Sequence, residues 1–328
     1  MVGRRGFTLG AAAGAVAWPA VAGAQQPPAA AWPDRPLRWL VGYPPGGPSD
    51  TFARLTGAHI GARLGQSVLV ENRVGGGAVL ASEAAARSAP DGYTMLHVDN
   101  GILVYNPALY ARLPYDPDRD LRGVGFIGRF PLFIVVRPDN PARDFADFLA
   151  RSKAQAPNYG TPAVASPHHL AMEMVKRRTG LQANHVPYRG GPAAMNDLLA
   201  GQVDSVMIDC ATGIPFITSG RARALCVLSE ARSPRAPEVP TLGELGVRDA
   251  VAYGWQGMSV PTGVPAPVVG RLNEALRAAV AADDVRARFA TLGIEGADWS
   301  PGEFDAFVRR ENAAWRPLIR DLGIRLDS

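Results

Sequence analysis

The chain has 328 residues, of which 47% are hydrophobic and 20% charged, and its formal net charge is +4. This is an ordinary globular composition, long enough for two domains, and it excludes disordered and fibrous chains. The basic residues are scattered and form no block interleaved with aromatic residues, so we expect no nucleic-acid partner.

The first residues resemble an export signal. Arg4 and Arg5 precede an alanine-rich run that ends in an A-x-A pattern at Ala22 to Ala24. We therefore expect residues 1–24 to be a signal peptide, cleaved near Ala24, and the mature protein to lie in the periplasm. The twin-arginine and general secretory routes both stay open. No apolar run of about eighteen residues follows, so we expect no membrane insertion once the signal is removed.

The elements that follow alternate between strands and helices. Strand-like runs cover residues 37–43, 67–72 and 93–98, and apolar residues recur at helical spacing between them. The pattern restarts with a strand at 131–138 and alternates to about residue 229. A proline-rich loop at 229–246 then precedes amphipathic helices at 266–282 and 302–318. This order predicts parallel sheets with crossover helices.

The loop after the first strand is a candidate anion site, because open α/β sheets bind ligands at the carboxyl ends of their strands. Gly46 and Gly47 allow backbone conformations that other residues avoid, and Ser49 or Asp50 is expected as the helix N-cap. Free amides and the helix dipole would face an anion there. A rigid turn with an ordinary cap is the alternative interpretation.

Two later loops repeat this design. Ser166 is expected as an N-cap with Pro167 at the first helical position, and Gly190 and Gly191 precede another helix. If both domains present such helix ends to one cleft, they form an anion site lined by backbone, to which Arg189 could contribute. This recurrence favours a binding function for the loops.

Five separated motifs resemble, in this order, the Bug family of extracytoplasmic solute receptors, the TctC-like binding proteins of tripartite tricarboxylate transporters. They are VGYPPGGPSDTFARL, VENRVGGGAVLASEAAARSAPDGYTML, YGTPAVASPHHLAMEMV, HVPYRGGPAAMNDLLAGQVDSVMID and RALCVLSEARSPRAPEVPTLGELGV. The resemblance covers residues 33–328. It implies an α/β, two-domain, type II periplasmic-binding-protein-like fold, in which each domain is a mainly parallel sheet flanked by helices.

The expected domains are residues 33–128 with 240–328, and residues 129–239. The resemblance implies a small carboxylate ligand held in the interdomain cleft by two loops, partly through backbone amides. Asn100, Asp209 and Trp255 are weaker positions that follow strands or lie on the return segment. The expected ligand contacts are Tyr43, Pro45, Gly46, Gly47, Ser49, Asp50, Asn100, Thr161, Ala163, Ser166, His169, Arg189, Gly190, Asp209 and Trp255.

The second loop departs from the family pattern, which is roughly Gly-Ser-x-Gly-x-Gly-Ser. Pro162, Ala163 and Ala165 interrupt the glycines, so we expect the freedom to adopt positive φ at the alanines to be lost. A narrower, altered or more apolar pocket is the resulting hypothesis.

Three alternatives remain at this stage. Ser166, His169 and Asp209 are residue types of a hydrolase triad, although no G-x-S-x-G motif is present, so an exported serine hydrolase is the competing class. Cys210 and Cys226 are either two buried thiols or a disulfide.

We expect no catalysis, metal or cofactor. The expected partner is a membrane permease with a large and a small subunit, or a sensor kinase, and the protein is expected to be a monomer.

Overall fold

The computed structural model describes residues 32–326, so the predicted signal peptide lies outside the described residues. The strands are β1 (Leu37–Val41), β2 (Val68–Asn72), β3 (Thr94–Asp99), β4 (Leu121–Val136), β5 (Asn158–Thr161), β6 (Asn184–Pro187), β7 (Ser205–Asp209), β8 (Arg223–Val227) and β9 (Tyr253–Pro261).

The helices lie mostly between consecutive strands, as the alternating pattern predicts. They are α1 (Pro48–Leu64), α2 (Val79–Ala86), the π-helical η1 (Gly101–Tyr105), α3 (Asn106–Leu109), α4 (Pro117–Asp120), α5 (Phe145–Ser152), α6 (Pro167–Thr179), α7 (Gly191–Leu199), α8 (Cys210–Thr218), α9 (Ala266–Val280), α10 (Asp283–Leu292) and α11 (Pro301–Leu322). Within residues 32–326, none of these helices combines the length and the apolar character needed to cross a membrane.

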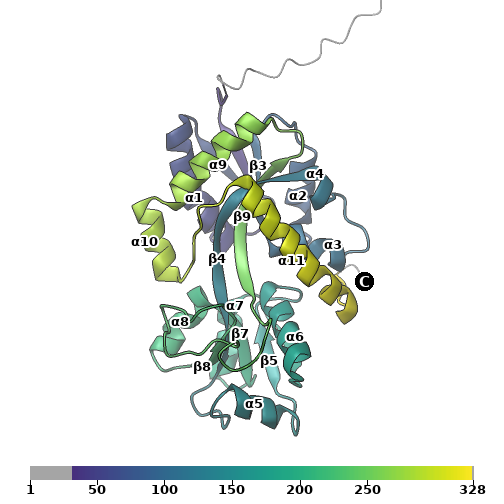
Figure 1. The fold of residues 1–328 in the computed structure, drawn as a ribbon, viewed down its shortest axis with the longest axis vertical. Helices are drawn as coiled ribbons and strands as arrows, with labels where there is room; N and C mark the ends of the chain where they lie inside the picture. The colour runs from purple at the N-terminus through teal and green to yellow at the C-terminus, as the bar shows by residue number, and fades with distance from the viewer. Residues whose placement is uncertain (1–31, 327–328) are drawn as a thin grey trace, which may run out of the picture.

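The strands form two lobes joined by β4 and β9, as Figure 1 shows. In lobe 1, β2, β1 and β3 pair in parallel and β9 joins β3 antiparallel. In lobe 2, β6, β5 and β7 pair in parallel, while β7 and β8 both pair antiparallel with β4. The α/β fold with helices on the sheets is as predicted, whereas the exact domain limits stay a prediction.

The carboxyl ends of the parallel strands in the two lobes face one another. Strand β4 runs from lobe 1 into lobe 2. Strand β7 pairs directly with β4, whereas β3 is connected to β4 through β9. Gln256 of β9 pairs with Asp99 at the end of β3 and with Gly128 of β4, whereas Asp209 at the end of β7 pairs with Leu132. The two ends are thus offset by four residues of β4, or about 13 Å of strand.

Strand β4 begins ten residues before the expected strand at 131–138. Residues 121–130 contain three glycines, which weaken a strand assignment made from the sequence. Packing explains the glycines. A Cβ on Gly125 would lie 2.9 Å from Asn273 Nδ2, and one on Gly128 would lie 2.8 Å from Ile294 Cγ2. The strand therefore needs small residues because helix α9 and the chain after α10 lie directly against it.

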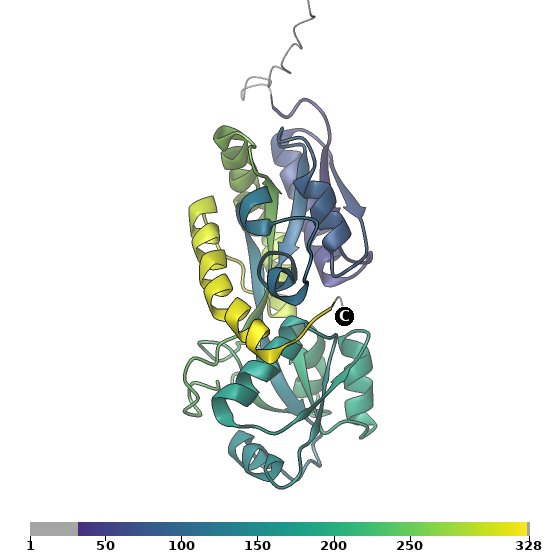
Figure 2. The ribbon, with the colours of Figure 1, turned by 90° about the vertical axis from the view of Figure 1, so that its right-hand side faces the viewer.

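One hydrophobic cluster extends through both lobes. It includes Trp255 of β9, Phe304 and Trp315 of α11, and Leu170 and Met172 of α6. In Figure 2, α11 runs along one side of lobe 1 and reaches lobe 2 near its last turns. An ion pair between Arg177 of α6 and Asp321 of α11, at 3.3 Å, links the two helices at that end. The lobes therefore share side-chain packing as well as strands.

The two cysteines are both unpaired and buried. Cys210 packs in the lobe 2 cluster with Ile214 and Val135, whereas Cys226 packs in the cluster that spans both lobes. Of the two alternatives, the structure has the buried thiols rather than the disulfide.

Candidate functional site

The first predicted loop connects β1 to α1, but its helix cap differs from the expected one. The N-cap is Gly47, with no side-chain hydrogen bond, and Pro48 occupies the first helical position. Ser49 and Asp50, which we expected as caps, lie buried in the first turn. The expectation was wrong because proline fixes its own φ and favours the first helical position, which moves the cap one residue earlier.

Asp50 instead ties the loop to its surroundings. Its carboxylate accepts hydrogen bonds from Gly46 N at 2.9 Å, Asn72 Nδ2 at 2.9 Å and Arg54 Nε at 2.9 Å. The bond from Arg54 contributes most to lowering the pKa of Asp50 from 3.8 to about 2, although burial opposes the shift. Gly46 has φ 77°, which glycine adopts without strain. The loop is therefore held in one shape by a carboxylate that is ionised near pH 7.

A buried polar cluster lies beneath this loop. Ser49 Oγ donates to Gln256 Oε1 at 3.0 Å, and His97 Nε2 contacts the same oxygen. Burial lowers the pKa of His97 to about 4, so its ring is neutral near pH 7. Neither His97 nor Gln256 is among the site residues predicted from the sequence. The only signal available was that a polar residue interrupts each of two apolar strands.

Tyr43 and Asp99 form a second polar pair at the carboxyl ends of β1 and β3. Burial, followed by the nearby Asp99 carboxylate, raises the pKa of Tyr43 well above 10. Burial likewise raises the pKa of Asp99, whose Oδ1 accepts a hydrogen bond from Ile102 N at 3.0 Å. Asp99 was not predicted as a site residue, although it directly precedes the predicted Asn100.

Asn100 and Trp255 have structural partners. The Asn100 amide donates to Tyr105 Oη and Tyr253 O, and its oxygen accepts from Trp255 N at 2.9 Å. Trp255 is fully buried, and its indole donates to Glu311 Oε2 at 3.1 Å. These bonds occupy the polar groups of both side chains: Asn100 joins the end of β3 to β9, and Trp255 joins β9 to α11.

The second predicted loop connects β5 to α6 and is closed by its own hydroxyl groups. Ser166 is the N-cap of α6, as predicted, and accepts a hydrogen bond from His169 N at 3.3 Å. Ser166 Oγ and Thr161 Oγ1 both donate to Ala163 O, at 2.8 and 3.1 Å. Thr161 Oγ1 also lies 2.6 Å from His185 Nε2. The loop is thus a closed hydrogen-bond network.

Ala165 adopts the conformation that we expected an alanine to lose. Its φ is 55°, in the left-handed region, and its N–H donates to His169 Nδ1 at 3.0 Å. The neighbouring Val164 is 44% exposed, which gives the loop an apolar tip. The expectation about φ was wrong at this position because the histidine bond helps to offset the cost of about 1–2 kcal/mol for an L-residue.

The geometry does not assemble a hydrolase triad. The ring of His169 stacks on His185 with centroids 3.8 Å apart, and its Nδ1 is occupied by a backbone amide. Asp209 caps α8 by accepting from Thr212 N at 2.8 Å, and its carboxylate lies 3.4 Å from His168 rather than bonding His169. Ser166 therefore lacks the general base that nucleophilic catalysis requires.

The third loop, between β6 and α7, contacts the second. Gly190 is the N-cap of α7 with φ 108°, and its N–H donates to Pro162 O at 2.9 Å. Tyr188 N donates to Thr161 O at 2.9 Å. Arg189 is exposed beside them. Lobe 2 thereby groups Thr161, Ala163, Ser166, His169 and Gly190 at one edge, with Asp209 at the end of the neighbouring β7.

The predicted residues therefore fall into two groups at facing strand ends. Lobe 1 contributes Tyr43, Pro45, Gly46, Gly47, Ser49 and Asp50. Lobe 2 contributes Thr161, Ala163, Ser166, His169, Arg189, Gly190 and Asp209. The N-termini of α1, α6 and α7 belong to these groups, and such helix ends attract anions. Asn100 follows β3 in lobe 1, and Trp255 lies on β9, which joins the lobes. Their role as ligand contacts, like that of the others, stays a prediction.

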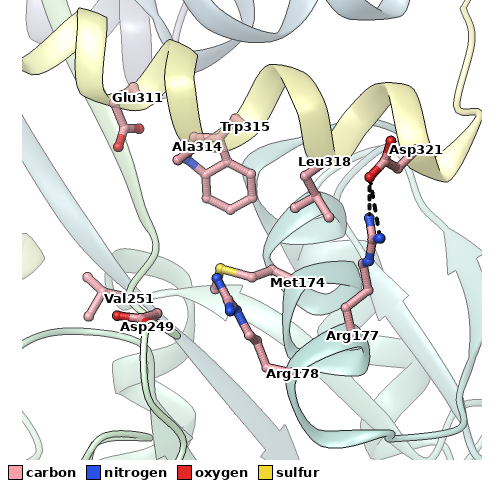
Figure 3. Close-up of a pocket in the computed structure, with 10 residues that line it drawn as sticks. All are labelled: Met174, Arg177, Arg178, Asp249, Val251, Glu311, Ala314, Trp315, Leu318 and Asp321. Atoms are coloured by element: carbon pink, nitrogen blue, oxygen red, sulfur yellow. Dashed lines mark hydrogen bonds and ion pairs between the residues drawn. The ribbon is translucent and has the colours of Figure 1, made fainter.

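A separate hollow of about 520 Å³ lies between α6 and α11 (Figure 3). It is lined by Met174, Arg177, Arg178, Asp249, Val251, Glu311, Ala314, Trp315, Leu318 and Asp321. None of the predicted contact residues is among this lining, so the hollow is distinct from the loop groups. Within residues 32–326, no group of three histidine, cysteine or acidic residues is arranged to hold a metal ion.

Comparisons with known proteins extend over nearly the whole chain. The model of the tripartite tricarboxylate transporter family receptor, TctC, matches residues 52–324. Protein BugT of Bordetella pertussis is 33% identical over 298 residues, which are 90% of this chain and 91% of that protein.

Solved structures agree with these sequence matches. A structure of an R. palustris protein with adipate has a TM-score of 0.79 and 30% identity, covering 90% of this chain and 99% of that one. MatC from Rhodopseudomonas palustris with bound malate has a TM-score of 0.76 and 29% identity, covering 88% and 100%.

Proposed function

Because the chain belongs to the TctC family of tripartite tricarboxylate transporter receptors, we propose that it captures a small carboxylate between the two loop groups. The chain is a solute-binding receptor and not an enzyme. The observation that carries the proposal is that helix N-termini of both lobes lie at strand ends that face one another. The exported serine hydrolase considered from the sequence is not retained, because Ser166 lacks a general base.

The proposed binding mode uses backbone amides more than charged side chains. Asp50 and Asp209 have internal partners, so they do not need the solute. Each of α1, α6 and α7 has a proline without an N–H in its first two positions, and His169 N is bound to Ser166 Oγ, so the remaining first-turn amides are the ones proposed to face the solute. A carboxylate between such helix ends gains charge-assisted hydrogen bonds from both lobes. Closure of the lobes around the solute would bury it and form a surface that a partner can recognise.

Two structural neighbours support a carboxylate as the ligand class, because one structure is of the protein with adipate and the other is of the protein with bound malate. Both molecules have carboxylates at two ends. The exposed Val164 and the alanines of the second loop favour a ligand with an apolar portion near that loop. This extends the hypothesis of an altered pocket without naming the solute.

The proposed location and partners follow from the family. Such receptors are periplasmic, and we propose cleavage near Ala24 and function as a monomer. The proposed partner is the permease with a large and a small subunit. A sensor kinase that reads the closed form is the second candidate.

Thermal unfolding against a panel of carboxylates and their amide counterparts tests the ligand class. A ligand at about 100 times its dissociation constant adds about 2.7 kcal/mol, which raises the melting temperature by a few degrees. We expect shifts with one or more acids and none with the matched amides. Equal shifts with acid and amide, or silence from the whole panel after removal of copurified ligand, would contradict the proposal.

A further inference from the structure

The hollow between α6 and α11 lies on the boundary between the lobes. One wall belongs to lobe 2 and consists of α6 and residues 249–251, which a hydrogen bond from Ala252 N to Leu228 O at 2.8 Å holds beside β8. The other wall is α11, which Arg316 fixes to lobe 1 by donating to Leu103 O at 2.9 Å. The volume of about 520 Å³ is within the range of about 300–1,000 Å³ that is usual for small-molecule sites.

The middle of the hollow is apolar and aromatic. In Figure 3, Trp315 and Leu318 extend from α11 toward α6, and Met174 extends from α6 toward α11. Val251, at 41% exposure, adds an apolar side chain from the third segment. An aromatic ring beside a flexible thioether provides a surface that packs against the apolar part of a ligand.

The acidic groups that α11 contributes to the hollow already have partners. Asp321 pairs with Arg177 at 3.3 Å. Glu311 accepts a hydrogen bond from the Trp255 indole at 3.1 Å, and burial raises its pKa. The charges that a ligand can use must therefore come from the wall in lobe 2.

That wall presents two opposite charges without partners. Among residues 32–326, the side chains of Arg178 and Asp249 form no hydrogen bond or ion pair, either with other residues or with each other. Figure 3 shows the Arg178 guanidinium extending from α6 into the hollow and Asp249 beside Val251. Asp249 has φ 53°, a left-handed conformation that aspartate tolerates better than most residues. A molecule that carries both an anion and a cation would pair with both groups at once.

We infer that this hollow is a second binding site, separate from the loop groups, for an α-amino acid with a large apolar side chain. The carboxylate pairs with Arg178, the ammonium group pairs with Asp249, and the apolar side chain packs against Trp315 and Met174. The occupant touches both lobes, because these residues come from α6, α11 and the segment before β9.

Isothermal titration with L-leucine, L-methionine and L-phenylalanine tests the inference. We expect at least one of them to bind, and we expect Arg178→Gln and Asp249→Asn each to weaken that binding about 10-fold. The N-acetyl and amide derivatives of the same amino acid, each of which lacks one charge, should also bind about 10-fold more weakly. Both substituted side chains are exposed, and asparagine tolerates the φ of residue 249, so both variants should keep the wild-type melting temperature.

The matched control is Arg320→Gln, at an exposed arginine of α11 outside the lining, which should bind like the wild type. No binding of any of the three amino acids would overturn the inference. Binding that both variants retain unchanged would also overturn it, because the amino acid would then lie elsewhere. A loss in only one variant would refute the pairing of both charges.

The same variants keep this inference separate from the proposed function. Adipate and malate in the loop groups would not touch Arg178 or Asp249, so any binding of these acids should be unchanged in both variants. If the wild type binds no acid from the carboxylate panel, the proposed function fails, whereas the amino-acid titrations still decide the role of the hollow.

Discussion

Asp50 gives the first loop its shape through three neighbours, Gly46, Arg54 and Asn72. The carboxylate is almost fully buried, so each of these bonds replaces water that the group has lost. A single residue thus connects the glycine loop, the first helix and the end of β2.

Replacing this carboxylate should be costly. We expect Asp50→Asn to lower the free energy of unfolding at pH 7 by about 2 kcal/mol, the equivalent of its pKa shift. Because the folded pKa is lowered, this stabilisation is present above pH 3.8 and is lost as pH falls toward about 2. Urea unfolding measures it. Asp139→Asn, at an exposed aspartate, should change stability by less than about 0.5 kcal/mol, and an equal loss in both variants would refute the assignment.

The buried histidines should make the protein acid-sensitive. His97 and His169 have pKa values lowered from 6.5 to about 4, so between these values the unfolded chain binds protons that the folded chain does not. The free energy of unfolding should therefore fall as pH decreases from 6.5 to about 4, by about 1.4 kcal/mol per pH unit for each histidine. Urea unfolding across this range tests the slope. In His97→Gln it should be shallower by one proton, and an unchanged slope would contradict the prediction.

At the scale of elements, α6 begins where the sequence indicates and for the expected reason. Ser166 caps it, Pro167 takes the first position, and Gly180 ends it with φ 74°. Capping depends on residues adjacent in sequence, so single-sequence reasoning is suited to it. At α1, the same reasoning placed the cap wrongly because several capping residue types occur together in the loop.

The role of Ser166 as a cap predicts a modest effect. Ser166→Ala should lower the free energy of unfolding by about 1 kcal/mol, as for other N-cap serines. Ser300→Ala, at the capping box of α11, is the matched comparison and should give a similar loss. Chemical denaturation of both variants decides the matter. A loss at residue 166 several times that at residue 300 would mean that the hydroxyl does more than cap and hold the loop.

Contacts between distant segments mark the limit of the sequence-based analysis. His97 and Gln256 are 159 residues apart, and nothing local to either residue indicates the other. The same holds for β9, which lies between β3 and β4 and so brings Trp255 into the hydrophobic cluster that spans both lobes. The fold class and the family were predictable because they depend on alternation and on motifs in order. The hydrogen bonds that Thr161, Ser166 and Asn100 form within the protein were not predictable, because they depend on which partner each polar atom finds.

At the scale of the whole molecule, β4 and β9 form a ribbon that both lobes share. Their pairing shifts register between Gly123 and Gly125 and between Phe126 and Gly128. Such irregularities increase local twist and allow a strand to bend. Motion of one lobe relative to the other must therefore twist or bend this ribbon. It must also alter the contact between α6 and α11, which is a second link between the lobes.

Arg129 fastens this ribbon where it enters lobe 2. Its guanidinium lies 3.9 Å from the centre of the Tyr253 ring and pairs with Glu230 at 3.0 Å and Glu295 at 2.8 Å. We expect Arg129→Met to lower the free energy of unfolding by about 1–2 kcal/mol, because the partner carboxylates are largely exposed and solvent weakens each pair. Urea unfolding measures the loss.

A matched arginine provides the control for this prediction. Arg35 lies 4.1 Å from the centre of the Tyr93 ring and pairs with Asp91, but its side chain is 61% exposed against 27% for Arg129. Arg35→Met should therefore cost less than Arg129→Met. Equal losses would show that joining the lobes adds nothing to the contribution of Arg129.

The two buried thiols affect how fast the protein is chemically inactivated over time. Burial raises the pKa of Cys210 to about 11 and raises that of Cys226 further, so the reactive thiolate is scarce in the folded state. Unfolding exposes both sulfurs and restores their ordinary acidity. Oxidants and alkylating reagents then act almost only on chains that have opened, and each such event removes a molecule from the refolding population. In an oxidising compartment, the lifetime of the receptor would therefore be governed by how often it opens rather than by its equilibrium stability alone.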